Sequence, residues 1–264
     1  MRVTIRRVMA VAVLLVLASP ARSAELPDSL SVSFPVDGAI TGAAILVAGV
    51  GEFASPVLGP LHCRWCDPPG VDASVHGALV WGNAALASTG SDVLFVTLPA
   101  AVVAYDFLAA RGKGSDLGRI EEDVLVIVES VAVATVAAEM AKYATARERP
   151  EAYYGHPTSR DANLSFVSTH AVVTFAAAAA GGEVARMRGY PGWPFVYAAG
   201  FAGAAFTGYL RLAGNQHWLS DVLAGAALGT GSGLLVPWLH RGPGDRGTLH
   251  LVPMPSGLAV AGTF

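Results

Sequence analysis

The fold is organised around residues 210–221, which read LRLAGNQHWLSD and lie between two long apolar runs. Arg211, His217 and Asp221 stand out here, because polar side chains are costly to bury in an apolar neighbourhood. His217 and Asp221 are four residues apart, so on one helix the carboxylate of Asp221 would reach an imidazole nitrogen and fix the tautomer of His217. Arg211 would add permanent positive charge beside them. The stretch indicates phosphate chemistry, although a His–Asp pair at this spacing is more often a structural hydrogen bond.

The composition indicates a membrane protein of one domain. Hydrophobic residues make up 53% of the 264 residues and charged residues only 14%, whereas about a quarter of the residues in a typical soluble protein are charged. This length fits one sizeable domain. The net charge of −3 provides no basic surface for a phosphate backbone, which argues against nucleic acid as a partner.

Residues 1–24 have the layout of a secretory signal peptide. Arg2, Arg6 and Arg7 are followed by an apolar run and then by small residues. Arg22 interrupts the small-residue pattern before one cleavage site, so an uncleaved N-terminal anchor is the alternative. In either case we expect the chain to be exported or inserted with its N-terminal arginines in the cytoplasm.

Residues 25–90 form an N-terminal region with an apolar segment at 39–58 and a short predicted helix at 75–86. Between them, Cys63 and Cys66 could form a structural disulfide, a redox-active pair or half of a metal site. A disulfide is favoured, because an exported protein meets oxidising conditions and no second pair of cysteines exists to complete a zinc site.

Five further segments are predicted to be helices, because they are long and rich in alanine and show no alternation of apolar and polar residues. They cover residues 91–109, 120–142, 166–185, 193–212 and 217–240. The predicted fold is an all-α helical bundle, a polytopic membrane protein with about five to six apolar helices and the active site at one end. For the second segment a helix of a soluble bundle is the alternative, because Glu129 lies in its middle.

Basic residues mark the connections that we expect to face the cytoplasm. They are Arg111, Lys113 and Arg119, then Arg186 and Arg188, and finally Arg241 and Arg246. The connections near 143–165 and 213–216 then face the opposite side, where the polar candidate residues gather. This assignment requires that the N-terminal segment crosses outward and that residues 39–58 do not cross the membrane singly.

The chain therefore divides into residues 1–24, residues 25–90, a helical core at 91–240 and a tail at 241–264. The tail changes character, with two short apolar stretches on either side of Ser256 and Gly257. It forms either a small hairpin around this turn or a disordered segment.

A second polar group lies at the end of the predicted helix 120–142. Lys142 and Arg149 are seven residues apart, so both cations point the same way if the helix persists. Pro150 then prevents its simple continuation. Taken alone, this group could be a basic anchor at the membrane interface.

A third polar group opens the next apolar helix. Ser168 and Thr169 are natural helix caps, and the first turn of a helix presents unpaired N–H groups to an anion. His170 follows directly, where it could protonate a leaving-group oxygen. Taken alone, a histidine at the start of a helix is usually a cap or a surface residue.

Taken in order, the three groups resemble the motifs of the type-2 phosphatidic acid phosphatase superfamily, which also includes bacterial class A acid phosphatases and vanadium haloperoxidases. The matching residues are Lys142-x6-Arg149-Pro150, Ser168-x-His170 and Arg211-x5-His217-x3-Asp221. Two motifs depart from the usual pattern. The second usually reads Pro-Ser-Gly-His but here reads Val-Ser-Thr-His, and a serine usually precedes the arginine of the third, where this chain has leucine.

The resemblance implies that residues 91–240 are a phosphatase core that needs no metal and no cofactor. His217 would attack phosphorus and form a phosphohistidine, while Asp221 stabilises the charge on its ring. His170 would protonate the leaving alcohol and then take a proton from the attacking water. The phosphate would be held by Lys142, Arg149, Ser168, Thr169 and Arg211.

We expect a phosphatase of the bacterial inner membrane whose active site faces the periplasm. Its substrate would be a phosphomonoester or diphosphate of a membrane lipid, such as phosphatidate, an isoprenyl diphosphate or a lipid A phosphate. The alternatives are a soluble periplasmic acid phosphatase of broad specificity and, more remotely, a vanadium-dependent haloperoxidase. Outside the motifs, we expect Arg147 to lie in a solvated loop and Glu139 only to polarise a helix end.

Overall fold

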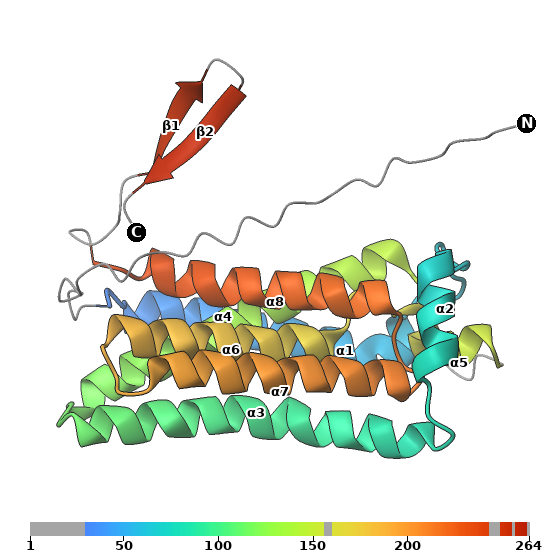
Figure 1. Ribbon diagram of the computed structural model, residues 1–264, viewed down its shortest axis with the longest axis horizontal. Coiled ribbons are helices and arrows are strands. Elements are labelled where there is room, and N and C mark those ends of the chain that lie inside the picture. Colours follow the sequence, from blue (N-terminus) through green and yellow to red (C-terminus); the bar gives the residue numbers. More distant parts are fainter. Residues whose placement is uncertain (1–29, 156–159, 243–248, 255–256, 263–264) are drawn as a thin grey trace, which may run out of the picture.

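An alanine-rich helix, α6 (Thr169–Met187), lies at the centre of a helical bundle in the computed structural model (Figure 1). Most of its side chains are buried, and their small size lets neighbouring helices approach its backbone closely. The structure describes residues 30–155, 160–242, 249–254 and 257–262. The helices around α6 are α1 (Phe34–Leu58), α3 (Ala84–Gly112), α4 (Leu117–Thr145), α7 (Trp193–Ala213) and α8 (Leu219–Leu239). Within the described residues, the predicted all-α bundle is confirmed.

Shorter elements lie at the ends of the bundle and after it. The helices α2 (Gly70–Leu79) and α5 (Pro150–Tyr153) lie at one end, as Figure 1 shows, and the 3₁₀ turn η1 (Arg160–Asn163) precedes α6. The predicted short helix at 75–86 differs from the structure, where α2 ends at Leu79, inside this range, and Asn83 caps the start of α3. In the tail, the strands β1 (Leu249–Met254) and β2 (Gly257–Gly262) pair as an antiparallel hairpin.

Helix α8 packs against α6 through glycines spaced four residues apart. A Cβ atom added at Gly225 would lie 2.8 Å from the carbonyl oxygen of Ser168, and one added at Gly229 would collide with the carbonyl of Val172. The two backbones are thus in direct contact. This contact brings the start of α8 to the start of α6, where the Ser168 N–H donates a hydrogen bond of 3.1 Å to the Asp221 carbonyl.

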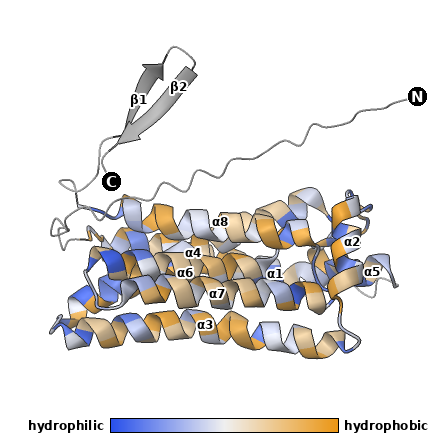
Figure 2. Cartoon of the chain, in the orientation of Figure 1, coloured by the Kyte–Doolittle hydropathy of each residue, from blue (hydrophilic) through white to orange (hydrophobic). Residues whose placement is uncertain are grey.

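Four helices, α1, α3, α4 and α8, are long and apolar enough to cross a membrane. Figure 2 shows apolar residues along α3 and α8. Large apolar side chains also face outward on α1, where Leu46 is 70% and Phe53 is 88% exposed. An apolar outer surface of this extent is typical of helices in contact with lipid. This apolar surface supports the prediction of a membrane protein over that of a soluble helical bundle.

The sequence left the placement of residues 39–58 open, and the structure shows how they pack in the bundle. Helix α1 passes once along α4, from Asp37 beside Glu129 to Glu52 beside Lys142, so residues 39–58 do run singly along the bundle. The low charge of this segment allows it to pack along α4 for its whole length. The predicted signal peptide or anchor at 1–24 lies outside the described residues.

Candidate active site

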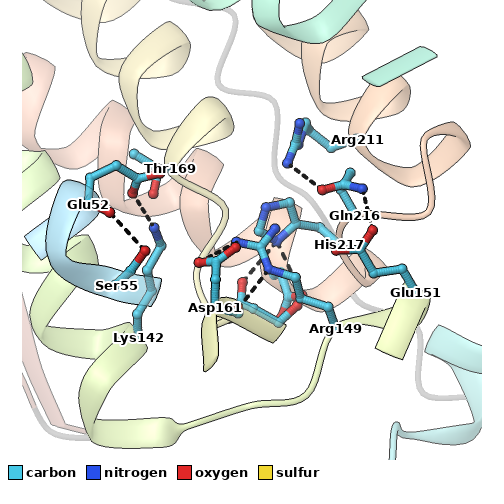
Figure 3. Close-up of polar contacts among 12 residues, drawn as sticks. Glu52, Ser55, Lys142, Arg149, Glu151, Asp161, Thr169, Arg211, Gln216 and His217 are labelled. Carbon is cyan, nitrogen blue, oxygen red and sulfur yellow. Dashed lines mark hydrogen bonds and ion pairs between the residues drawn. The ribbon is translucent and has the colours of Figure 1, made fainter. Parts of the chain in front are cut away.

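The predicted motif residues gather at one end of the bundle, where α1, α4 and α7 end and α3, α6 and α8 begin. Figure 3 shows Lys142, Arg149, Thr169, Arg211 and His217 at this end. They come from the end of α4, the following loop, the start of α6, the end of α7 and the residues before α8. The connections with paired basic residues lie at the other end: Arg188, for example, binds Asp123 there at 2.6 Å. The motifs and the basic connections are therefore separated by the length of the bundle.

Lys142 lies in the last turn of α4 between two carboxylates. Its Nζ donates hydrogen bonds of 2.8 Å to Glu139 and 3.1 Å to Glu52. Glu139 precedes Lys142 by three residues and so shares its face of the helix. The prediction that Glu139 only polarises a helix end is wrong, because its carboxylate pairs with Lys142 inside the site. The charge of Lys142 is thus already partly balanced before an anion binds.

The predicted shared face of Lys142 and Arg149 required α4 to continue to Arg149, but the helix does not reach this residue. It ends at Thr145, and Ala146 follows in the left-handed conformation with φ 44°. The position of Arg149 is therefore set by the loop and not by the helix. Its guanidinium pairs with the Asp161 carboxylate at 3.2 Å, and the Asp161 side chain is 35% exposed. Arg149 keeps a partner that water already screens, and this leaves it suited to bind an incoming phosphate.

Arg147 is buried beneath the site, which contradicts its predicted place in a solvated loop. Its guanidinium lies 3.8 Å from the ring of Trp65 and binds Asp72 at 2.6 Å and Asp221 at 2.5 Å. The side chain is 1% exposed, and both carboxylates are fully buried. Arg147 therefore holds the start of α8 to α2 through two carboxylates that no water solvates.

The adjacent cysteines, Cys63 and Cys66, form a disulfide, as predicted. The short loop they close carries Trp65, whose backbone pairs with Arg147 in an isolated β-bridge. The Arg64 N–H also donates a hydrogen bond of 2.9 Å to the Ala146 carbonyl. The cross-linked loop thereby braces the segment that carries Arg147 and Arg149.

The start of α6 offers donors that have no protein partner. Ser168 precedes the helix, and its hydroxyl makes no capping hydrogen bond. Among the described residues, neither the Oγ of Ser168 nor the Nε of Arg211 has a hydrogen-bond partner, although both atoms are buried. The first amides of a helix are also free to bind an anion. Buried donors without partners are costly, so they indicate a ligand at this point.

His217 does not donate the predicted hydrogen bond to Asp221. Helix α8 begins only at Leu219, so the two residues do not share a helical face. Asp221 instead accepts the Trp218 N–H at 2.9 Å and the Ser165 hydroxyl at 2.6 Å, in addition to Arg147. Its nearest oxygen is 3.6 Å from Nδ1 of His217. Asp221 is occupied by other donors and can act on the imidazole only through its charge.

The tautomer of His217 is set by a backbone carbonyl. Its Nδ1 lies 2.9 Å from the oxygen of Ser165, which can only accept a hydrogen bond, so Nδ1 carries the proton and Nε2 keeps its lone pair. Burial lowers the pKa of His217 well below its ordinary value, and the positive charges of Arg149, Arg211 and Lys142 lower it further. His217 is therefore a neutral imidazole whose Nε2 has no hydrogen-bond partner among the described residues.

His170 and Arg211 meet at a carboxylate from α3. Asp92 Oδ1 lies 2.8 Å from Nε2 of His170 and accepts a hydrogen bond of 3.3 Å from Nη1 of Arg211. Ser91 and Gln216 accept two further hydrogen bonds from Arg211, at 3.1 and 3.3 Å. An anionic group thus already sits between the cation and the histidine that were predicted to handle phosphate.

The charged residues that reach the site without having been predicted include Glu52, Asp72, Asp92 and Arg147. Arg147 carried one signal, because it lies two residues before a motif arginine. The other three come from α1, α2 and α3, at least 75 residues before Lys142, Arg147 and His170, which they contact, and no local pattern marks them. Only the packing of the helices brings them to the site.

A comparison with known proteins finds a family match in the second half of the chain. Residues 123–244 match the PAP2 superfamily. Over 46 residues the chain is 48% identical to the lipid A 1-phosphatase of Porphyromonas gingivalis. This match covers 17% of the chain and 10% of the length of that protein. No solved structure matches the chain.

Proposed function

We infer that this chain, whose residues 123–244 match the PAP2 superfamily, is a metal-independent phosphatase that acts on a phosphorylated membrane lipid. The observation that carries the proposal is the neutral, buried His217 with a free Nε2 beside cations from three different segments. A neutral imidazole in a cationic pocket is suited to attack a phosphate whose charge the cations neutralise.

In the proposed reaction, Nε2 of His217 attacks phosphorus and the bond to the leaving oxygen breaks. The phosphate becomes bonded to His217, and His170 gives a proton to the departing alcohol. A water molecule then attacks the phosphohistidine, loses its proton to His170 and releases phosphate with neutral His217. Each step conserves charge and atoms without a metal.

The phosphate would occupy the space between Arg149, Arg211 and the start of α6. There the Oγ of Ser168 and the Nε of Arg211 gain the partner that they otherwise lack. The amides of Thr169 and His170 add the electrostatic contribution of a helix start. Burial lowers the pKa of His170 to about 2, and the nearby positive charges, that of Arg211 first, contribute to this. The bound phosphate would replace Asp92 beside Arg211 and His170, and its negative charge would raise this pKa toward the protonated form that the first step requires.

The lipid character of the proposed substrate rests on the position of the site. It lies at the ends of apolar helices, where lipid headgroups are found, and the similar region of the Porphyromonas gingivalis protein belongs to a lipid A 1-phosphatase. We propose that this end faces the periplasm, because the basic connections at the other end favour the cytoplasm. The disulfide at the site end agrees with an oxidising compartment.

A substrate panel tests the proposed activity. We expect detergent-purified protein to release phosphate from phosphatidate, an isoprenyl diphosphate or lipid A with EDTA present, and to act less well on p-nitrophenyl phosphate, which lacks the lipid. Phosphate release measured at equal enzyme concentration gives the order of preference. Activity that EDTA abolishes within the assay, or a preference for the water-soluble ester, would contradict the proposal.

The pH dependence of kcat/KM tests the state of His217. Because the nucleophile is the neutral imidazole and its pKa is lowered, activity should persist as the pH falls through about 6.5 and be lost only below it. Arg211→Gln removes one of the charges that lower this pKa, so its acidic limb should move to higher pH. A wild-type limb at or above 6.5, or no movement in the variant, would show that these cations do not control His217.

A further inference from the structure

A second cluster of polar side chains lies at the end of the bundle away from His217. It consists of Asp37 in the first turn of α1, Glu129 in the middle of α4 and His240 at the end of α8. Helix α8 has 21 residues, so His240 lies about 30 Å along the helix axis from the proposed active site. The proposed phosphatase chemistry uses none of these three residues.

The three side chains direct acceptor atoms at one point. Nδ1 of His240 lies 2.9 Å from the Val236 carbonyl, so this nitrogen carries the proton and Nε2 offers its lone pair. Asp37 Oδ2 and Glu129 Oε2 face the same nitrogen. Glu129 is 6% exposed, and its Oε2 has no hydrogen-bond partner among the described residues. Three converging acceptors repel one another unless a positive charge lies between them.

The distances fit a metal ion better than direct hydrogen bonds. Nε2 of His240 is 3.5 Å from Asp37 Oδ2 and 3.4 Å from Glu129 Oε2, at or near the limit for a hydrogen bond. A tetrahedral zinc ion with bonds of about 2.0–2.2 Å holds its ligand atoms about 3.4 Å apart. All three ligand atoms lie within 4.8 Å of one another. The Ser33 N–H donates a hydrogen bond of 2.6 Å to Asp37 Oδ2, which fixes this carboxylate in place.

We propose that Asp37, Glu129 and His240 form a binding site for one divalent transition-metal ion, zinc in the first instance, with water as the fourth ligand. A nitrogen and two carboxylate oxygens are a ligand set that zinc accepts. The ion would join the start of α1 to α4 and α8. Because the other end of α1 carries Glu52 against Lys142, it would fix the position of α1 along the bundle without entering the reaction.

Zinc binding to the full chain tests this site. Protein purified in detergent without a polyhistidine tag is stripped with a chelator, dialysed against Zn²⁺ and passed through a desalting column. We expect elemental analysis to find about one zinc ion per chain and Zn²⁺ to raise Tm, since a ligand of the folded state stabilises it. Glu129→Gln and His240→Gln should lose both effects, whereas His62→Gln, which changes an exposed histidine, should keep them.

Cobalt binding provides a spectroscopic measurement of the site that does not depend on the variants. Co²⁺ bound in a tetrahedral site absorbs strongly in the visible range, so titration of the stripped wild-type protein should produce this absorption and Zn²⁺ should remove it. The proposal is overturned if wild-type protein retains no zinc and shows no such absorption, which would mean that a proton on His240 holds the cluster together. It is also overturned if Glu129→Gln and His240→Gln bind as much zinc as the wild type.

Discussion

His217→Ala is expected to lower phosphate release by about four to six orders of magnitude, because it removes the proposed nucleophile. The loss should appear in kcat, since His170, the other histidine close to Arg211, directs its Nε2 at Asp92 and is proposed as the acid, not the nucleophile. Purified variant and wild type are compared by phosphate release from the preferred lipid substrate. Rapid quenching of the wild-type reaction should also trap an acid-labile phosphoenzyme that His217→Ala does not form.

Two controls separate this effect from misfolding. The variant should keep the helical content of the wild type by circular dichroism, and His62→Ala, which removes an exposed histidine of the cysteine loop, should retain full activity. Turnover of His217→Ala within tenfold of the wild type would refute the phosphohistidine mechanism. A phosphoenzyme that still forms in the variant would place the nucleophile elsewhere.

Arg147→Met and Arg149→Met are expected to affect different properties, although the two arginines are only two residues apart. The first should lower stability and the second should lower activity. Loss of Arg147 leaves the buried carboxylates of Asp72 and Asp221 without their cation, which should lower the free energy of unfolding by about 3–5 kcal/mol. Arg149 pairs with the partly exposed Asp161, so its loss should cost at most about 1 kcal/mol. It should instead lower kcat about 10²–10³-fold, because it removes a proposed phosphate donor.

Denaturant unfolding in detergent and phosphate release by the folded protein measure the two effects separately. If Arg147→Met does not fold, Arg147→Lys keeps the charge and gives a smaller loss of stability. Asp72→Asn added to Arg147→Met should restore part of the stability, since it removes one of the two unpaired charges. Equal losses of stability for Arg147→Met and Arg149→Met would show that burial does not distinguish these arginines.

The sequence predicted the helical bundle and the end of it that carries the motifs. Apolar composition and helix length are local properties, so the helices after residue 90 lie close to their predicted ranges. The spacing of Lys142, Arg149, Ser168, Arg211 and His217 also pointed to one family before any contact was known. The disulfide was favoured because an exported protein meets oxidising conditions and no second cysteine pair exists to complete a zinc site, and the structure contains it.

Local spacing was a poor guide where a helix ended sooner or began later than the pattern suggested. Helix α4 ends at Thr145 and α8 begins at Leu219, so neither the predicted face of Lys142 and Arg149 nor the predicted His217–Asp221 hydrogen bond exists. Helix ends depend on caps and tertiary contacts. The carboxylate oxygens of Asp221 accept hydrogen bonds from Arg147, from Ser165 and from the backbone N–H at the start of its own helix.

The sequence by itself determined which side chains could perform phosphate chemistry, because the charge of a cation and the lone pair of an imidazole belong to the residue. Only the tertiary structure decided their partners and their charge states. Glu52 and Asp92 reach the site from helices that lie before the motifs, and burial among cations keeps His217 neutral. The same packing joins Asp37, Glu129 and His240, which are separated by about 90 and 110 residues along the chain. Solvation and long-range charge depend on which segments meet, and no local pattern encodes this.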